Sequence, residues 1–297
     1  MKTELFFTAD VGNTRAKVAL WQTTSTLGKL SCERVGEVCS DATDAFETTE
    51  GWLAALPVDA ARPCAWRVSS VAPRRAAALE ALVRRLRPTD VFALLKLGDV
   101  PISVRYKRPE KLGLDRVVAA YAGVKVVGRG VPFLVIDVGT AATIDFVDGR
   151  GVFRGGAILS GSRLAAKTLH DYTAALPMLD EPDKYDADDA ESELTFPATE
   201  TSAAIRLGVF HSIIGAITVF YWQTRRIVEA EGGDPKRLSM LIAGGDAEAT
   251  ERLLRRYFED LNACLGASAP TPEVLVAPGL VLQGAADLAL EEYRRNS

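Results

Sequence analysis

The sequence has few of the residues that build metal centres and disulfide frameworks. Its 297 residues include four cysteines and two histidines, with no Cys-x-x-Cys spacing and no histidine pair at helical or zinc-finger spacing. Zinc sites and disulfide-stabilised folds depend on such spacings, so we expect neither. The cysteines are Cys32, Cys39, Cys64 and Cys264.

A strong excess of one charge and a long apolar run are missing too. The net charge is −4, and the arginines occur in scattered pairs such as Arg74–Arg75 and Arg225–Arg226, which we interpret as solvated helix faces. The N-terminal apolar segment is interrupted at Asp10, too soon for a signal peptide, and no run approaches the roughly 18 apolar residues of a membrane span. We therefore expect a cytoplasmic protein with neither nucleic acid nor membrane as a partner.

The composition is that of an ordinary globular protein, with 48% hydrophobic and 25% charged residues. The length is enough for two cores, and the apolar spacing predicts an α/β fold with lobes at 1–128 and 129–297. The acidic stretch 180–193 predicts a surface loop or cap, because such a charge density cannot be buried. We expect strands near 5–10, 15–22, 30–38, 64–71, 91–95, 133–137, 142–147, 152–158 and 240–243, and helices near 43–55, 74–87, 114–127, 161–174, 199–231 and after 245.

One arrangement occurs in each half of the chain: an apolar run, then Asp-Val-Gly with a small hydroxyl residue close behind, then a second apolar run. The copies are Leu5–Thr14 and Phe133–Thr143. A strand that delivers an acid and a glycine into a tight turn suits phosphate binding. Two ordinary hairpins are the alternative, but the repetition favours two related lobes that hold one nucleotide between them.

These segments resemble the phosphate motifs of the acetate and sugar kinase, Hsp70 and actin superfamily. The double glycine after the strand at 240 resembles the adenosine motif of that superfamily, and the absence of Gly-Lys-Ser/Thr excludes a P-loop. The resemblance implies two actin-like (ribonuclease H-like) lobes with a nucleotide cleft between them. The implied ATP- and phosphate-binding residues are Asp10, Gly12, Asn13, Thr14, Lys17, Gly139, Thr140, Thr143, Gly244 and Gly245.

A further segment narrows the family. Tyr106–Arg116 resembles the substrate motif of type III pantothenate kinases, as do Gly155–Ile158 and the spacing from Thr201 to Gly208. Two local departures are Ser160, where the family usually has proline, and 197–201, which replaces the more usual Gly-x-Asn before the threonine. The resemblance implies ATP-dependent phosphorylation of the primary hydroxyl of pantothenate, the first step of coenzyme A biosynthesis. The implied substrate-binding residues are Tyr106, Gly113, Leu114, Asp115, Arg116 and Thr201.

By this resemblance Asp115 is the catalytic base, and an acid at a helix start can accept the proton of an attacking hydroxyl. Without the surrounding motif, the better interpretation of Asp115 would be an acid at a helix N-terminus that is favoured by the helix dipole. Tyr106 is also interpretable as a strand aromatic in a core, and Thr201 as an N-cap of the long helix. In the kinase interpretation Tyr106 and Arg116 hold the amide and carboxylate of the substrate.

The resemblance implies ATP and two cations as cofactors. Asp10 would position Mg²⁺ through water, and Asp137 would hold a monovalent cation, potassium or ammonium. The apolar middle of 199–231 predicts a homodimer in which Thr201 reaches the site of the neighbouring subunit. The alternatives are a kinase for another small hydroxy acid and a nucleotide-sensing regulatory protein of the same fold without useful turnover.

Overall fold

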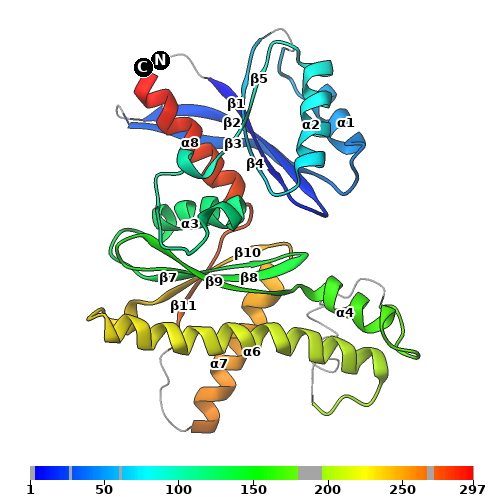
Figure 1. Ribbon diagram of the computed structural model, residues 1–297, viewed down its shortest axis with the longest axis vertical. Helices are drawn as coiled ribbons and strands as arrows, with labels where there is room; N and C mark the ends of the chain where they lie inside the picture. The colour runs from blue at the N-terminus through cyan, green and yellow to red at the C-terminus, as the bar shows by residue number, and fades with distance from the viewer. Residues whose placement is uncertain (1–3, 27–28, 60–61, 180–195, 266–270, 297) are drawn as a thin grey trace. The chain divides into compact units, whose positions relative to one another are not determined.

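The computed structural model describes residues 4–26, 29–59, 62–179, 196–265 and 271–296 (Figure 1). The acidic stretch 180–193, expected to be a loop or cap, lies outside these residues. The described chain divides into two compact units. Unit 1 comprises Met1–Ser103, Lys107–Val126 and Gly279–Ser297, and unit 2 comprises Val104–Tyr106 and Val127–Pro278.

Unit 1 contains a five-stranded sheet with the order β3-β2-β1-β4-β5. The apolar strand β1 is central, pairing antiparallel with β2 and parallel with β4. Phe7, Ala9 and Val11 alternate toward one face and are fully buried there, as the two-residue period of a strand requires. The strands are β1 Leu5–Val11, β2 Ala16–Thr26, β3 Lys29–Asp41, β4 Ala65–Ser70 and β5 Val91–Leu94.

Helices cover both faces of this sheet (Figure 1). Helices α1 (Glu47–Ala55) and α2 (Pro73–Leu86) pack against the core that includes Phe7. On the opposite face α8 (Leu280–Asn296) packs its Leu282 and Ala286 against β1 and β2. Helix α3 (Leu114–Val127) lies close to α8, since a Cβ at Gly284 would be 2.6 Å from the carbonyl oxygen of Val118.

Unit 2 contains a six-stranded sheet with the order β11-β10-β7-β8-β9-β6. Strand β7 is again central, antiparallel to β8 and parallel to β10. Order β9-β8-β7-β10-β11 therefore repeats order β3-β2-β1-β4-β5 of unit 1. The strands are β6 Ser103–Val104, β7 Phe133–Val138, β8 Ala141–Val147, β9 Val152–Ser160, β10 Ser239–Gly244 and β11 Glu273–Val276.

Helices α6 (Thr201–Ala230) and α7 (Ala247–Leu265) pack on one face of this sheet, and α4 (Ser162–Asp171) follows β9 (Figure 1). Helix α6 is long and apolar enough to cross a membrane by length and composition. This corrects the expectation that no segment approaches such a span. The core helix of a soluble protein passes the same test, and Ile217 and Tyr221 of α6 are buried against the sheet.

The α/β class and the two related lobes expected from the sequence are confirmed by the repeated strand order. The division of the chain differs from two continuous lobes, because residues 279–297 return to unit 1. The physical reason is the apolar face of α8, which covers Phe6 and Trp21 of the first sheet. Neither β11 nor α8 was among the expected elements.

Candidate functional site

The first hairpin places Asp10 at the end of β1, directly opposite Lys17 of β2. Between them Gly12 closes the turn, with its N–H donating to the carbonyl of Arg15 at 2.9 Å. A Cβ at Gly12 would lie 3.1 Å from that oxygen, so the position favours glycine. The N–H of Gly12 is thus engaged within the turn, whereas the predicted donors on Asn13 and Thr14 are exposed.

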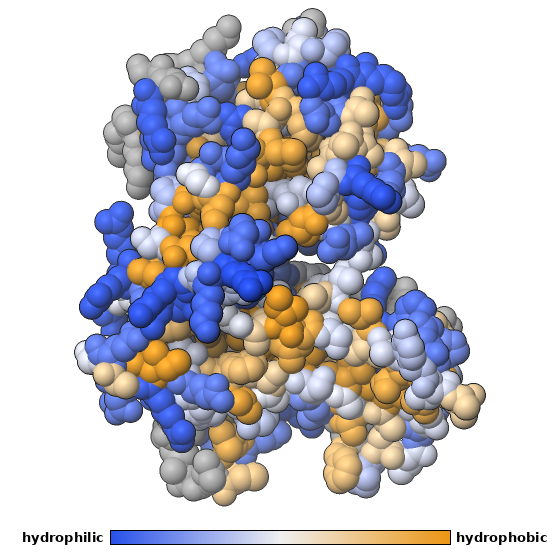
Figure 2. Space-filling view, in the orientation of Figure 1, coloured by the Kyte–Doolittle hydropathy of each residue, from blue (hydrophilic) through white to orange (hydrophobic). Residues whose placement is uncertain are grey.

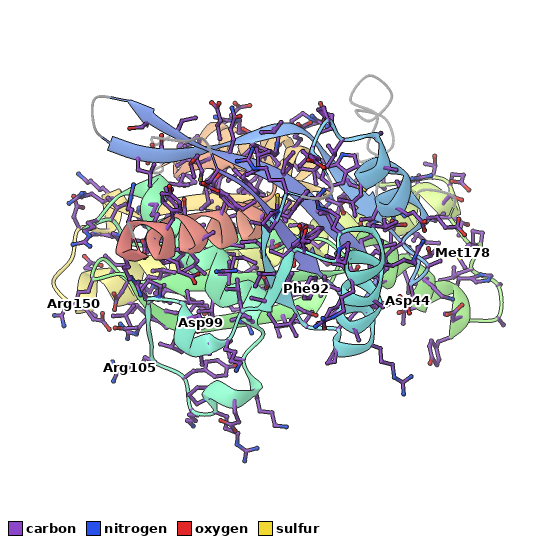
Figure 3. All side chains as sticks on the ribbon, turned by 90° about the horizontal axis from the view of Figure 1, so that it is seen from above. Asp44, Phe92, Asp99, Arg105, Arg150 and Met178 are labelled. Atoms are coloured by element: carbon purple, nitrogen blue, oxygen red, sulfur yellow. The ribbon has the colours of Figure 1, made fainter. Side chains whose placement is uncertain are left out.

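A residue that the sequence analysis missed supports this turn. Arg75 of α2, expected on a solvated helix face, is only 5% exposed. Its guanidinium donates to the carbonyl oxygens of Gly12 at 3.0 Å and of Asp41 at 3.3 Å, and its Nε lies 2.7 Å from a carboxylate oxygen of Asp44. Figure 3 labels Asp44 next to the helices of unit 1. The sequence around Arg75 does not indicate this contact, because Gly12 and Asp41, whose carbonyl oxygens accept its hydrogen bonds, lie far away in the sequence.

The second hairpin repeats the first in unit 2. Asp137 lies near the end of β7, directly opposite Thr143 of β8. Gly139 occupies the turn, and its N–H donates to the carbonyl of Ala141 at 3.0 Å. The predicted donor Thr140 is exposed at the tip.

Three loops of unit 2 come together at this turn. A Cβ at Gly161 would lie 1.9 Å from the carbonyl oxygen of Gly139, so the segment before α4 lies directly on the hairpin. The N–H of Gly161 donates to the carbonyl of Thr140 at 3.0 Å. Gly244, at φ +99°, would place a Cβ 2.1 Å from the carbonyl oxygen of Val138. Only glycine fits either contact. The close approach of Gly244 to Val138 makes the predicted adenosine and phosphate motifs neighbours here.

A side-chain hydrogen bond joins two of these loops. The hydroxyl of Ser162, which is 1% exposed, donates to a carboxylate oxygen of Asp246 at 2.6 Å. The backbone N–H of Asp246 donates to the carbonyl of Val138 at 3.2 Å. Asp246 therefore ties the end of the Gly244–Gly245 segment both to β7 and to the start of α4. Neither Ser162 nor Asp246 was singled out in the sequence.

The predicted base, Asp115, lies in the first turn of α3 in unit 1. Its carboxylate accepts a 2.8 Å hydrogen bond from the N–H of Arg116. Burial raises the pKa of Asp115, and the hydrogen bond and positive charge of Arg116 oppose that rise. A Cβ at Gly113 would lie 2.6 Å from the same carboxylate, so glycine leaves the room that Asp115 occupies. Arg116 is 8% exposed, which makes it a buried cation, and Leu114 is half-buried.

Tyr106, the other predicted substrate residue, belongs to unit 2. Its ring packs over Gly155 of β9 and lies tilted against Phe153, with centroids 6.4 Å apart. The side chain is still 37% exposed. It is therefore a surface aromatic that rests on a strand, and the alternative of a strand aromatic packed in a core is wrong.

Thr201 begins α6 and is exposed. The N-cap is the preceding residue, Glu200, whose carboxylate accepts from the N–H of Ala203 at 2.9 Å. The interpretation of Thr201 as the cap is therefore wrong. Its hydroxyl is not required to start the helix.

The predicted residues thus fall into two groups. Unit 1 holds the first hairpin with Asp10, Gly12, Asn13, Thr14 and Lys17, and the α3 start with Gly113, Leu114, Asp115 and Arg116. Unit 2 holds Tyr106, Asp137, Gly139, Thr140, Thr143, Thr201, Gly244 and Gly245. The function of each of these residues, and the shared nucleotide site, stay predictions.

The sequence also matches known proteins. A sequence model of the family described as type III pantothenate kinase matches residues 6–223. Type III pantothenate kinases are 32% identical over 61% of this chain in Persephonella marina and 34% identical over 65% in Rhodopirellula baltica. These two alignments span 64% and 59% of the relatives' own lengths.

A third alignment is nearly complete. The type III pantothenate kinase of Alkalilimnicola ehrlichii is 34% identical over 95% of this chain and 96% of its own length. The family model covers residues from both units, and this relative covers nearly the whole chain. The chain belongs to the type III pantothenate kinase family.

Proposed function

We propose that this chain transfers a phosphoryl group from ATP to the primary hydroxyl of pantothenate. Family membership supports the reaction class, since the relatives carry that name. The observation that carries the proposal within the chain is Asp115. An ionisable carboxylate held at a helix start, with a pKa raised by burial, is suited to accept a hydroxyl proton.

In this reaction Asp115 orients the attacking hydroxyl and takes its proton as the bond to phosphorus forms. Phosphoryl transfer asks the protein chiefly for alignment and charge stabilisation. Lys17 supplies positive charge opposite Asp10, and Arg75 holds the Gly12 turn in place. A protein that only sensed nucleotide would have no use for Asp115, which favours the enzyme over the regulatory alternative.

Two cations enter the proposal on the chemistry of the carboxylates. Mg²⁺ is usually held by one or two carboxylates, water and substrate phosphates, and Asp10 at the phosphate-motif turn fits that donor set. When bound, Mg²⁺ would neutralise phosphate charge. Asp137, at the matching place in β7, is the proposed ligand for potassium or ammonium.

We also propose a cytoplasmic homodimer. The apolar middle of α6 was expected to be too broad for one lobe, but most of it is covered by the sheet of unit 2, including Phe210, Ile213 and Ile217. Val219 remains 52% exposed and Ile227 41% exposed. Figure 2 shows apolar patches interrupted by polar residues on the visible face of unit 2. The remaining exposed positions of α6 are the proposed contact with a second copy.

The test is phosphate transfer from ATP over a panel of hydroxy acids, measured with and without potassium. Pantothenate should be turned over fastest. Faster transfer to a sugar or a short-chain acid would contradict the substrate and leave a related kinase. Tight ATP binding with no transfer to any acceptor would favour the regulatory alternative.

A further inference from the structure

Unit 2 contains a cavity of about 620 Å³ at the end of its sheet away from the phosphate motif. It is lined by Phe146 near the end of β8, by Val152 at the start of β9, and by residues that follow α6. In the β7–β8 ladder Phe146 and Thr143 are three pairs apart, roughly 10 Å along the strand. The cavity therefore lies apart from Asp137 and its turn.

The acidic residues of this cavity already have donors. Asp148 accepts from Arg154 at 3.1 Å and from two backbone N–H groups of the β8–β9 turn at 3.0 and 3.1 Å. Glu231 accepts two bonds from the guanidinium of Arg154, at 3.0 and 2.9 Å, which lower its pKa. Asp234 accepts a 2.9 Å bond from the N–H of Lys236. All three carboxylates therefore already accept hydrogen bonds from the protein, while Glu231 and Asp234 remain exposed.

The arginines are not matched in this way. Besides Arg154, the cavity is lined by Arg105, Arg150 and Arg237, all exposed. Within the part of the chain that the structure describes, the guanidinium groups of these three make no hydrogen bond or ion pair, although the positive charge of Arg105 helps to lower the pKa of Glu231. Figure 3 shows Arg105 and Arg150 at the same margin of the molecule. The cavity therefore offers three guanidinium groups to a ligand.

The remaining wall is apolar and firmly placed. Phe146 is 8% exposed, and the guanidinium of Arg154 lies over its ring, 5.9 Å from the centroid. Pro132, Val152 and Val228 complete this side. A buried apolar wall facing exposed cationic side chains suits a ligand with an apolar body and an anionic end.

We propose that this cavity binds an organic phosphate. The guanidinium fork matches phosphate oxygens with paired hydrogen bonds, so Arg105, Arg150 and Arg237 would hold the phosphate group. The apolar body of the ligand would lie against Val152, the half-buried apolar residue of this wall, beside the stacked Arg154 and Phe146. The volume is within the range of small-molecule sites, roughly 300–1,000 Å³. This proposal does not depend on the kinase activity.

Calorimetric titration with 2-naphthyl phosphate tests the proposal, since this probe combines an aromatic body with one phosphate group. We expect one probe to bind per chain. Inorganic phosphate has only the anionic group and 2-naphthol has only the aromatic body, so each should bind at least about tenfold more weakly than 2-naphthyl phosphate. Absence of any binding heat for 2-naphthyl phosphate would overturn the proposal.

Substitutions of the cavity arginines test whether the probe binds in this cavity. Arg150→Ala/Arg237→Ala should weaken the probe at least about tenfold, and Arg150→Lys/Arg237→Lys should weaken it less, because lysine keeps the charge but not the fork. The matched control is Arg255→Ala/Arg256→Ala, which removes the same charge from exposed positions of α7. Unaltered thermal unfolding would show that the exposed substitutions leave the fold intact. Equal weakening in the control, or unchanged binding in Arg150→Ala/Arg237→Ala, would overturn the proposal.

Discussion

The hydroxyl of Ser162 donates a 2.6 Å hydrogen bond to the carboxylate of Asp246, 84 residues further along the chain. The bond joins the start of α4 to the segment that follows Gly244–Gly245. Because Ser162 is buried, water has little access to take its place. The conformation of the predicted adenosine segment therefore depends on a residue in another loop.

Ser162→Ala should weaken ATP binding without removing the base. Loss of a buried hydrogen bond to a carboxylate costs about 1–3 kcal/mol, so we expect a lower free energy of unfolding and a raised KM for ATP with a smaller change in kcat. Steady-state kinetics and urea denaturation measure both. Ser212→Ala is the control, because its hydroxyl donates to the carbonyl of Val209 within α6. An unchanged KM for ATP in Ser162→Ala would remove this role.

Asp115→Asn keeps the size of the side chain but removes its basicity. Turnover should fall by about 10²- to 10⁴-fold, with nucleotide binding nearly intact. The raised pKa of Asp115 predicts an acidic limb of kcat/KM at a higher pH than that of an ordinary aspartate, because the base must be ionised.

The raised pKa of Asp115 affects folding and activity in opposite directions. Activity needs the ionised carboxylate, whereas the folded state is more stable with the proton bound. Since the folded state binds this proton more tightly, the contribution of Asp115 to folding is fully present below its unfolded pKa and is lost as the pH rises through its folded pKa. In Asp115→Asn the free energy of unfolding should therefore fall less as the pH rises, because the ionisation of Asp115 no longer contributes to that fall. Unchanged turnover in this variant would exclude Asp115 as the base.

Potassium or ammonium should activate transfer, sodium should do so poorly, and Asp137→Ala should abolish the difference. A cation beside Asp137 would offset the repulsion between its carboxylate and the phosphates. Initial rates in chloride salts at constant ionic strength provide the measurement. Equal rates in all three salts would leave Asp137 with a structural or magnesium-linked function.

Mixing two inactive variants tests whether the subunits of the dimer share their active sites. If Thr201 of one subunit completes the site of the other, combining Asp115→Asn with Thr201→Arg should restore activity, because one hybrid site carries neither change. Light scattering should give the mass of two chains. A monomer would contradict the dimer, whereas a dimer without restored activity would leave Thr201 in its own subunit's site or in none.

Thiol alkylation should separate the cysteines. Burial and the charge of Asp287 raise the pKa of Cys32 to about 11, and burial also raises the pKa of Cys39 and Cys64. At pH 8 a thiol with a pKa of about 11 is about 0.1% thiolate, so Cys32 should react at least about tenfold more slowly than the exposed Cys264. Mass spectrometry after iodoacetamide treatment measures this. Loss of the fast phase in Cys264→Ser is the control, and rapid labelling of Cys32 in that variant would contradict the expectation.

The sequence predicts the parts of this fold that local patterns determine. The Asp-Val-Gly hairpins are visible because an apolar run, an acid and a glycine turn are consecutive, and the β1–β2 and β7–β8 ladders confirm them as hairpins. Helix α3 is visible from Gly113 and the apolar spacing that follows it. These elements position most of the predicted residues.

The rest depends on contacts that a local pattern does not encode. Arg75 resembles any helix-surface arginine, and only the folded loops bring Gly12 and Asp41 to its guanidinium. The apolar middle of α6 predicted a second subunit, but much of it meets the sheet of its own unit. The Ser162–Asp246 bond joins two polar residues, neither of which belongs to a motif.

The return of α8 to unit 1 has a consequence for biosynthesis. Strands β1 and β2 are synthesised early. Leu282 and Ala286, which cover Phe6 and Trp21, are synthesised only after all of unit 2. At roughly 5–20 residues per second, that interval lasts on the order of ten seconds or more. Throughout it the nascent chain carries an uncovered apolar sheet face, so unit 1 is the first to begin folding and among the last to finish.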